Sequence, residues 1–183
     1  KRFVYNLDLK DFFPSITSKR VFSVLQLEPL SLSADVASKI ANICTTELEV
    51  ERLTSSGECE TRIERVLPQG APSSPTLTNV ICQRLDRRLT GLAKRFGLRY
   101  SRYADDISFS SDHYVYKTNG KFVKELHRLI QGEGFYVNAS KTRLQKNTVR
   151  QEVTGVTVNQ KCNVSIQYIK SLRTMIHNWE KSG

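Results

Sequence analysis

The fold is decided by the stretch Leu98-Arg99-Tyr100-Ser101-Arg102-Tyr103-Ala104-Asp105-Asp106-Ile107-Ser108-Phe109-Ser110. Apolar and polar residues alternate on both sides of its centre, which is typical of two β-strands. The short link between the two runs predicts a hairpin with Asp105 and Asp106 at its tip. Two unpaired carboxylates repel by about 4 kcal/mol at ~4 Å and an effective dielectric of ~20. Mg²⁺, which prefers carboxylate oxygens, would remove this repulsion; a turn that only faces solvent is the alternative.

A third acid lies in a strand-like run near the start of the chain. Phe3, Tyr5, Leu7 and Leu9 alternate with Val4, Asn6 and Asp8. One face of this strand is therefore apolar, and Asp8 lies on the other. If the strand neighbours the hairpin in one sheet, Asp8, Asp105 and Asp106 converge. Three carboxylates could hold two Mg²⁺ ions about 3.5–4 Å apart, an arrangement that stabilises the attacking and leaving oxygens of phosphoryl transfer.

Composition limits the class of protein. The 183 residues, 39% hydrophobic and 25% charged, suit one well-buried globular domain. No apolar run approaches ~20 residues, so we expect no membrane partner. The four cysteines are scattered without a CxxC pair, which argues against a zinc site and favours reduced thiols in the cytoplasm. Lys plus Arg total 28 against 18 Asp plus Glu, and the net charge of +10 suggests a polyanionic partner such as nucleic acid.

Periodicity and turn residues predict the remaining elements in the first half of the chain. We expect a helix capped by Thr17 or Ser18, a helix after Ser33 with Val36, Ile40 and Ile43 inward, a hairpin over Glu47–Val66 around Ser55-Ser56-Gly57, and one helix from Pro75 to Gly97 capped by Ser74. The loop before that last helix, residues 67–75, is rigid because it contains three prolines.

The second half contains further alternating elements. We expect a helix after Asn119-Gly120 built on Phe122, Val123, Leu126, Leu129 and Ile130, a strand from Phe135, short strands over 153–158 and 162–165, and a helix over Ile166–Trp179. Helices and strands mix without strict βαβ alternation, so the predicted class is α+β.

Five segments, in this order, resemble the motifs of reverse transcriptases. Asn6-Leu7-Asp8-Leu9-Lys10-Asp11-Phe12-Phe13-Pro14-Ser15-Ile16 resembles motif A, Leu67–Pro75 motif B, Tyr103–Asp106 the YxDD motif C, Gly134–Thr142 motif D, and Val153-Thr154-Gly155 the VTG triplet of retron-type bacterial enzymes. Five matches in the expected order argue strongly against chance.

The resemblance implies a role for each matching residue. Asp8, Asp105 and Asp106 would bind two catalytic Mg²⁺ ions, with Mn²⁺ as a substitute, and Lys141 would lie near the departing pyrophosphate as its proton donor. The nucleotide triphosphate would lie along the backbone of Leu9, Lys10, Asp11 and Phe12. Gln69 and Gly70 would contact the incoming nucleotide and the template, and Tyr103 and Ala104 the primer end.

Phe13 is the residue that would select the sugar. It follows Asp8 by five positions, where an aromatic ring would lie under the sugar and block a 2′-OH. RNA-dependent RNA polymerases typically have an acid at this spacing and Gly-Asp-Asp in motif C. DNA is therefore the expected product, and plain core packing is the alternative role for Phe13.

The resemblance also implies an architecture: a polymerase palm with an antiparallel sheet packed on helices over residues 1–164, and the start of a helical thumb over 165–183. The basic fingers strands before motif A and the Asn-Ala-x-x-His motif of retron-type enzymes are not in this sequence. We therefore expect a segment of a longer protein that by itself binds primer–template weakly and polymerises poorly.

The function that the resemblance implies is RNA-directed DNA polymerisation on an RNA template from a DNA or RNA primer with deoxynucleotides. Phe12-Phe13-Pro14-Ser15, Gln69–Pro75 and the VTG triplet favour the retron type, which copies a cognate structured RNA into multicopy single-stranded DNA and serves with an effector protein in anti-phage defence. Alternatives are a group II intron or other defence reverse transcriptase, a catalytically silent nucleic-acid-binding module, and a structural subunit of a defence complex.

Three further features have two readings each. Asp11 is a further ligand or a solvated acid. The arginines after Leu77 follow a phosphate backbone or form an ordinary solvated helix face. Trp179 stacks on a base or packs against a neighbouring segment.

Overall fold

The computed structural model describes residues 1–53 and 59–182. The strands are β1 Phe3–Leu9, β2 Thr46–Leu53, β3 Cys59–Val66, β4 Arg99–Tyr103, β5 Asp106–Ser111, β6 Val137–Lys146, β7 Glu152–Val153 and β8 Val156–Thr157. The helices are α1 Ser18–Leu25, α2 Ala34–Cys44, α3 Ser74–Ile81, α4 Gln83–Arg95, α5 Lys121–Gln131 and α6 Ile166–Ser182. The predicted α+β class is confirmed.

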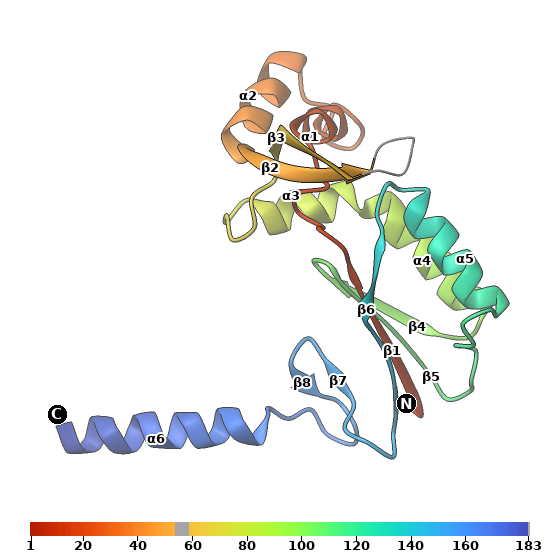
Figure 1. Ribbon diagram of the computed structural model, residues 1–183, viewed down its shortest axis with the longest axis vertical. Coiled ribbons are helices and arrows are strands. Elements are labelled where there is room, and N and C mark those ends of the chain that lie inside the picture. The colour runs from red at the N-terminus through yellow and green to blue at the C-terminus, as the bar shows by residue number, and fades with distance from the viewer. Residues whose placement is uncertain (54–58, 183) are drawn as a thin grey trace.

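The central sheet has the strand order β4-β5-β1-β6, and all its pairs are antiparallel (Figure 1). The hairpin predicted around Tyr103–Asp106 is the β4–β5 hairpin. The strand that contains Asp8 pairs directly with β5, and Asp8 lies opposite Asp106. The two sequence segments that contain the acids are therefore neighbours in one sheet, which meets the condition set for their convergence.

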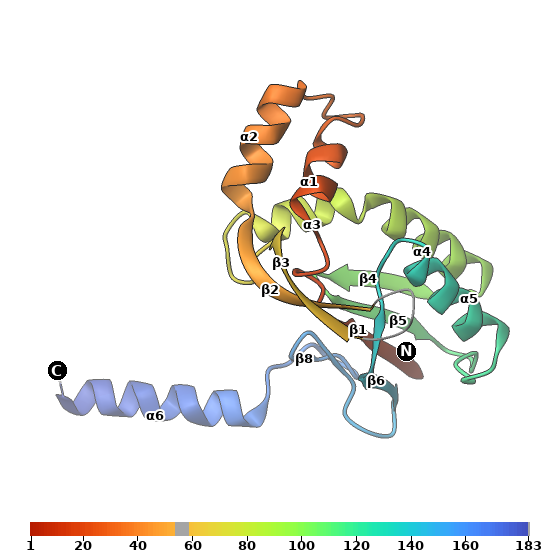
Figure 2. The ribbon, with the colours of Figure 1, turned by 45° about the horizontal axis from the view of Figure 1, so that its top comes forward.

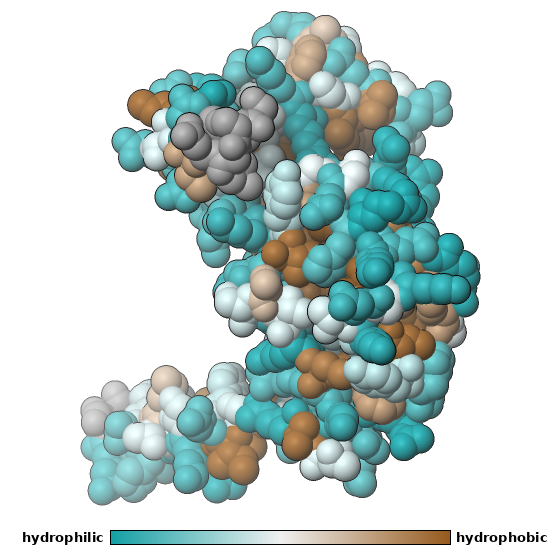
Figure 3. Space-filling view, turned by 45° about the vertical axis from the view of Figure 1, so that its right-hand side comes forward, coloured by the Kyte–Doolittle hydropathy of each residue, from teal (hydrophilic) through white to brown (hydrophobic). Residues whose placement is uncertain are grey.

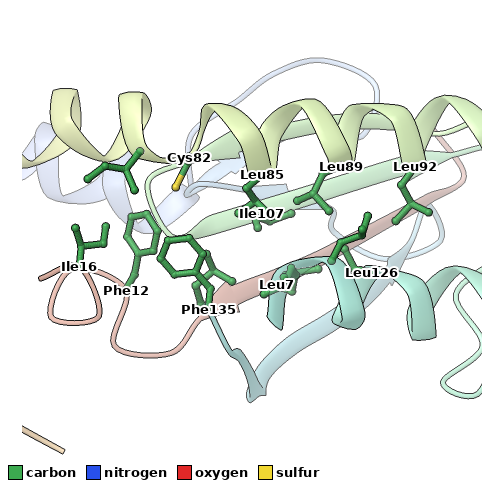
Figure 4. Packing of buried hydrophobic residues seen from close by; sticks show 14 of the residues in the cluster. Leu7, Phe12, Ile16, Cys82, Leu85, Leu89, Leu92, Ile107, Leu126 and Phe135 are labelled. Atoms are coloured by element: carbon green, nitrogen blue, oxygen red, sulfur yellow. The ribbon is translucent and has the colours of Figure 1, made fainter. Parts of the chain in front are cut away.

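Helices α4 and α5 cover one face of this sheet, and the main core lies between them. Figure 4 shows Leu7 and Ile107 of the sheet beneath Leu85 and Leu89 of α4 and Leu126 of α5. All five side chains are almost completely buried. Because side chains alternate along a strand, residues 6 and 8 point away from these helices. The helices thus support the sheet from behind and leave the face with Asp8 open.

Helices α1 and α2 begin where the sequence indicates, since Thr17 and Ser33 accept hydrogen bonds from the first-turn amides as N-caps. The prediction of the inner face of α2 is wrong for two residues. Ala37 and Ala41 are buried, whereas Val36 is exposed and Ile43 is 83% exposed. Small side chains let α2 approach α1 closely, and the larger apolar residues flank that contact.

The helix predicted from Pro75 to Gly97 is two helices. α3 ends at Ile81, and Cys82, with ψ near 0°, separates it from α4. Ser74 is not the N-cap but the first helical residue. Its buried hydroxyl donates to the Pro68 carbonyl at 2.7 Å and so locks the preceding loop.

The predicted hairpin over Glu47–Val66 is confirmed as β2–β3, whose register pairs Thr46 with Val66. Its expected turn at Ser55-Ser56-Gly57 lies outside the described residues. The strand expected from Phe135 begins at Val137, because the Phe135 ring is buried in the core.

The VTG triplet forms the turn between β7 and β8. Thr154 and Gly155 both have positive φ, at 47° and 81°. This is the conformation that tight two-residue hairpin turns require. The second short strand, expected over 162–165, is reduced to a single bridge between Asn163 and Thr157.

The last helix, α6, runs away from the body (Figures 1 and 2). Its apolar residues appear as brown patches on the projecting part in Figure 3. Trp179 is 75% exposed among the residues that the structure describes. Within the described ranges, no helix is both long enough and apolar enough to cross a membrane.

Candidate active site

The backbone positions of Asp8, Asp105 and Asp106 are adjacent where β1 ends and β5 begins. Asp8 is opposite Asp106 in the register of the two strands. The Leu9 amide donates to the Asp105 carbonyl at 3.1 Å, which fixes the hairpin tip beside the end of β1. Ala104 reverses the chain with φ of 50°. The backbone alone therefore brings the three acids together, although about 100 residues separate Asp8 from the other two.

The electrostatics of the cluster are those of crowded like charges. Burial raises the pKa of the Asp106 carboxyl, and the charges of Asp105 and Asp8 raise it further. Arg143 and Lys141 act in the opposite direction. A raised carboxyl pKa means that the ionised form is disfavoured. A bound cation would relieve this repulsion.

Asp8 is already engaged on both oxygens. Lys141 Nζ donates to Asp8 Oδ1 at 3.1 Å, and Asn138 Nδ2 donates to Oδ2 at 3.4 Å. Both partners come from β6, on the side of β1 opposite β5. In the described part of the chain, no three Asp, Glu, His or Cys side chains are grouped closely enough to hold a metal ion. The carboxylate oxygens fit Mg²⁺ chemically, but their side chains are not gathered around one point.

A cavity of about 430 Å³ opens in front of the acids. It is lined by Asn6, Leu7, Asp8, Asp106, Ile107, Ser108, Ser140, Lys141, Thr142, Arg143, Thr154 and Gly155. The sheet forms its floor, β6 one wall, and the turn of β7–β8 the other. Acidic and basic groups thus line the same cavity, as binding of both a cation and a phosphate chain would require.

The hairpin tip is anchored from beneath by residues that the sequence analysis did not assign. The Arg102 guanidinium, whose side chain is 4% exposed, makes two 2.8 Å hydrogen bonds to the Asp86 carboxylate of α4. Its Nη1 also donates to the Ala104 carbonyl at 3.0 Å. Tyr100 donates to the same carboxylate at 2.6 Å. The sequence does contain one signal for Asp86, because it is the one acidic residue in a helix with five basic residues.

A second missed residue is Asn6, which lies two positions before Asp8. Ser108 Oγ donates to Asn6 Oδ1 at 2.9 Å, and Asn6 Nδ2 donates to the Glu152 carbonyl at 2.6 Å. The one side chain therefore ties β1 to β5 and to β7. Nothing in the local sequence indicates the contact with Glu152, because Glu152 is 146 residues away.

The segment after Asp8 offers its backbone rather than its side chains. The Leu9 and Phe12 side chains are buried in the core. The Leu9 amide is bonded to Asp105, and the Lys10 amide donates to the Tyr136 carbonyl at 2.8 Å. Of the expected triphosphate contacts, the amides of Asp11 and Phe12 are therefore better placed than those of the two residues before them.

The remaining expected residues lie on separate elements and do not line the cavity at Asp8 and Asp106. Gln69 and Gly70 are exposed on the loop before α3, and Gly70 has φ of 89°. Tyr103 is 73% exposed beside the tip. Phe13 is half-buried, with its ring 5.3 Å from that of Phe12.

A family model described as "Reverse transcriptase (RNA-dependent DNA polymerase)" matches residues 1–158. Among curated proteins, the chain is 42% identical over its whole length to Retron Mx65 reverse transcriptase of Myxococcus xanthus, covering 42% of that protein. It is 36% identical over 97% of its length to Retron Mx162 reverse transcriptase of the same organism, covering 39% of it. It is 35% identical over 96% of its length to Retron Ec86 reverse transcriptase of Escherichia coli, covering 49% of it. The chain thus spans less than half the length of these relatives.

Solved structures show the same fold at low sequence identity. Telomerase from Candida albicans in complex with a telomeric RNA fragment matches with a TM-score of 0.54 and 13% identity, over 94% of this chain and 35% of that one. Apo telomerase from Candida tropicalis matches with a TM-score of 0.59 and 11% identity, over 89% of this chain and 32% of that one. At this identity the likeness concerns the fold alone.

Proposed function

The chain belongs to the reverse transcriptase family, and from that premise we propose that it is the palm of an RNA-directed DNA polymerase, with the thumb beginning at residue 165. The observation that carries this proposal is the placement of Asp8 opposite Asp106, with the Asp105 carbonyl bonded to the Leu9 amide. Asp8 and Asp106 then line one cavity on the sheet face that the helices leave open, and Asp105 adjoins them in the chain at the hairpin tip.

Asp8, Asp105 and Asp106 would hold two divalent cations, Mg²⁺ or Mn²⁺. When bound, these ions stabilise the attacking 3′-oxygen of the primer and the leaving oxygen of pyrophosphate. The protein supplies the fixed positions of the carboxylates, because strand pairing and the Arg102–Asp86 anchor hold both elements. Such positioning is where most of the catalysis of phosphoryl transfer arises.

Lys141 would act on the leaving group. Its ammonium group lies within the same cavity and carries a proton at neutral pH, because its hydrogen bond with Asp8 raises its pKa. The ammonium can donate from Nζ to an oxygen of the departing pyrophosphate. The amides of Asp11 and Phe12, together with Gln69 and Gly70, would position the nucleotide, and Tyr103 with Ala104 the primer end.

Deoxynucleotides are the proposed substrates. Phe13 has a half-buried ring that packs on the buried ring of Phe12, so its position is constrained. A constrained ring under the sugar excludes a 2′-OH by steric overlap. The template is RNA and the primer DNA or RNA, as for the family.

Within the reverse transcriptase family, we propose that this protein is of the retron type. Each of the three relatives named above is a retron reverse transcriptase, and the VTG turn of this chain lines the same cavity as Asp8. The protein would then copy a cognate structured RNA in the cytoplasm into multicopy single-stranded DNA and would act with an effector protein in anti-phage defence.

The test is primer extension by the full-length protein on an RNA template with Mg²⁺, offered deoxy- and ribonucleotides separately. Asp105→Asn should abolish incorporation, while Asp35→Asn, a change of the same kind on an exposed residue of α2, should not. Deoxynucleotide incorporation that both variants retain would contradict the assignment of the acids. RNA binding with no incorporation by the wild type would instead support a nucleic-acid-binding module.

A further inference from the structure

The positive charge of the chain is concentrated on two helices that the active site does not use. α4 carries five basic residues and one acid, and α5 three basic residues and one acid. Together they carry a net charge of +6, against +10 for the whole chain. This concentration does not follow from amphipathicity alone, which requires polar residues of either sign on the outer face.

The basic surface of α4 and α5 lies behind the sheet. Leu85, Leu89 and Leu126 point from these helices into the core toward Leu7 and Ile107 (Figure 4). The catalytic acids lie on the opposite face of the same strands. A primer–template held at the acids is therefore separated from this surface by the sheet and the core.

The arginines of the basic surface are held in pairs by shared glutamates. Glu133 accepts from Arg88 and lies 3.2 Å from Arg84 Nε. Glu125 pairs with Arg95 and lies 3.7 Å from Arg128. Each carboxylate neutralises one of its two guanidinium groups, so a positive charge remains at each pair. Arg84, at 72% side-chain exposure, still presents donors to solvent.

One end of the basic surface is hollowed. A cavity of about 280 Å³ lies between α1 and the start of α4, and its charged lining residues are Arg20, Arg84, Arg87, Glu28 and Glu133. Arg20 is fixed there, because its guanidinium stacks 4.5 Å from the Phe135 ring centroid and donates to the Glu133 carbonyl at 2.9 Å. Three guanidinium groups against two carboxylates leave a net positive charge in the recess, and guanidinium groups are suited to binding phosphate.

The spacing suits a continuous polyanion. Arg84 and Arg95 are eleven residues apart on α4, which corresponds to about 16 Å along the helix. A nucleic-acid duplex presents about ten phosphates over that length, at one charge per ~1.7 Å. Arg87, Lys94 and Lys124 are exposed on the two helices and add further charge.

We propose that the outer surface of α4 and α5, with the recess beside Arg20, binds the phosphate backbone of a base-paired nucleic-acid segment other than the primer–template at the acids. The identity of that segment as part of the template RNA or of the DNA product rests on the proposed function. Fixed arginine pairs favour such a ligand because less side-chain freedom is lost on binding.

The test measures binding of a 12-base-pair RNA hairpin and a DNA hairpin of the same sequence to the full-length protein, without nucleotides and with the primer–template already bound. The variant carries Arg87→Gln, Lys94→Gln and Lys124→Gln. The matched control loses the same charge elsewhere through Lys19→Gln, Lys39→Gln and Lys161→Gln. All six residues are exposed, so both variants should fold.

We expect the α4–α5 variant to bind the hairpins at least about tenfold more weakly than the control. The slope of the logarithm of the binding constant against the logarithm of the salt concentration should also become less steep by about 2 to 3, since each of the three lost phosphate contacts contributes about 0.9. The hairpin that binds more tightly identifies RNA or DNA as the source. Equal affinities of the two variants, or displacement of the hairpin by primer–template, would overturn the proposal. A wild type that binds hairpins but incorporates no nucleotide would contradict the proposed function instead.

Discussion

Lys141 Nζ lies 3.1 Å from Asp8 Oδ1, so a base and an acid that are 133 residues apart in the chain form an ion pair at the centre of the cavity. The ammonium occupies one side of the carboxylate that would also bind a cation. Lys141 is therefore the positive charge that is paired with Asp8, and this pair must adjust when a cation and a triphosphate enter.

Replacing Lys141 should reduce the rate of catalysis strongly and the stability of the fold only slightly. We expect Lys141→Gln to lower the deoxynucleotide incorporation rate by about 10²-fold, as removal of a general acid typically does. Its melting temperature should fall only slightly, because the Lys141 side chain is 62% exposed and Asp8, at 12%, keeps its hydrogen bond from Asn138. Single-turnover primer extension and thermal melting measure the two effects. Lys146→Gln, an exposed change on the same strand, is the control; equal rates for both variants would remove Lys141 from the mechanism.

The raised pKa of Asp106 predicts a pH-dependent stability difference. Its folded pKa exceeds the unfolded value, so the native state binds this proton more tightly, and the contribution of this group to stability falls as pH rises above about 4. Asp106→Asn has no ionisable carboxyl at this position, so its stability does not fall with pH for this reason. The variant should therefore gain melting temperature over the wild type by more at pH 7 than at pH 4, when both are measured without divalent cations.

Addition of Mg²⁺ provides the control for that measurement. A cation that binds only the native wild type raises its melting temperature and narrows the gap at pH 7. A difference between the two proteins that is the same at every pH would show that the neighbouring carboxylates do not repel Asp106.

The anchor beneath the hairpin tip should be important for folding. Asp86→Asn keeps the shape of the side chain but leaves the Arg102 guanidinium, 4% exposed, without its acid. Removing one partner of a buried ion pair typically costs about 3–5 kcal/mol of unfolding free energy. Urea denaturation measures this loss, and Asp35→Asn on α2 is the matched control. A loss below about 1 kcal/mol would mean that the pair is not buried in solution.

The hydrogen bonds of Asn6 predict local release of the β7–β8 hairpin. Asn6→Asp retains an acceptor for Ser108 but removes the donor to the Glu152 carbonyl and places a carboxylate against it. The partly buried carbonyl then lacks its partner, at a cost of about 1 kcal/mol, the low end of the range for buried groups. Amide hydrogen exchange over residues 152–157 should accelerate. Ser108→Ala, which keeps the bond to Glu152, should leave that exchange slow; similar exchange in both variants would contradict this role.

The sequence predicts the site better than it predicts the packing around it. The Asp8 strand and the hairpin could be identified because alternation over several residues is a strong local signal, and the motif order implied that they meet. Asn6, Arg102 and Asp86 could not be assigned, since their partners are set by tertiary contacts. The inner face of α2 was misassigned at Ile43 for the same reason: close helix contact selected alanines over larger apolar residues.

Phe13 provides the test of sugar selection. Phe13→Ala removes the ring that would lie under the sugar, and we expect the preference for deoxy- over ribonucleotides, as a ratio of kcat/KM values, to fall by about 10–200-fold, the range for one steric contact in a binding pocket. Phe13→Leu retains bulk and should keep most of the preference. Because the ring is half-buried against Phe12, both variants also need a melting curve. If the alanine variant melts normally and keeps the wild-type ratio, Phe13 is a packing residue and another group excludes the 2′-OH.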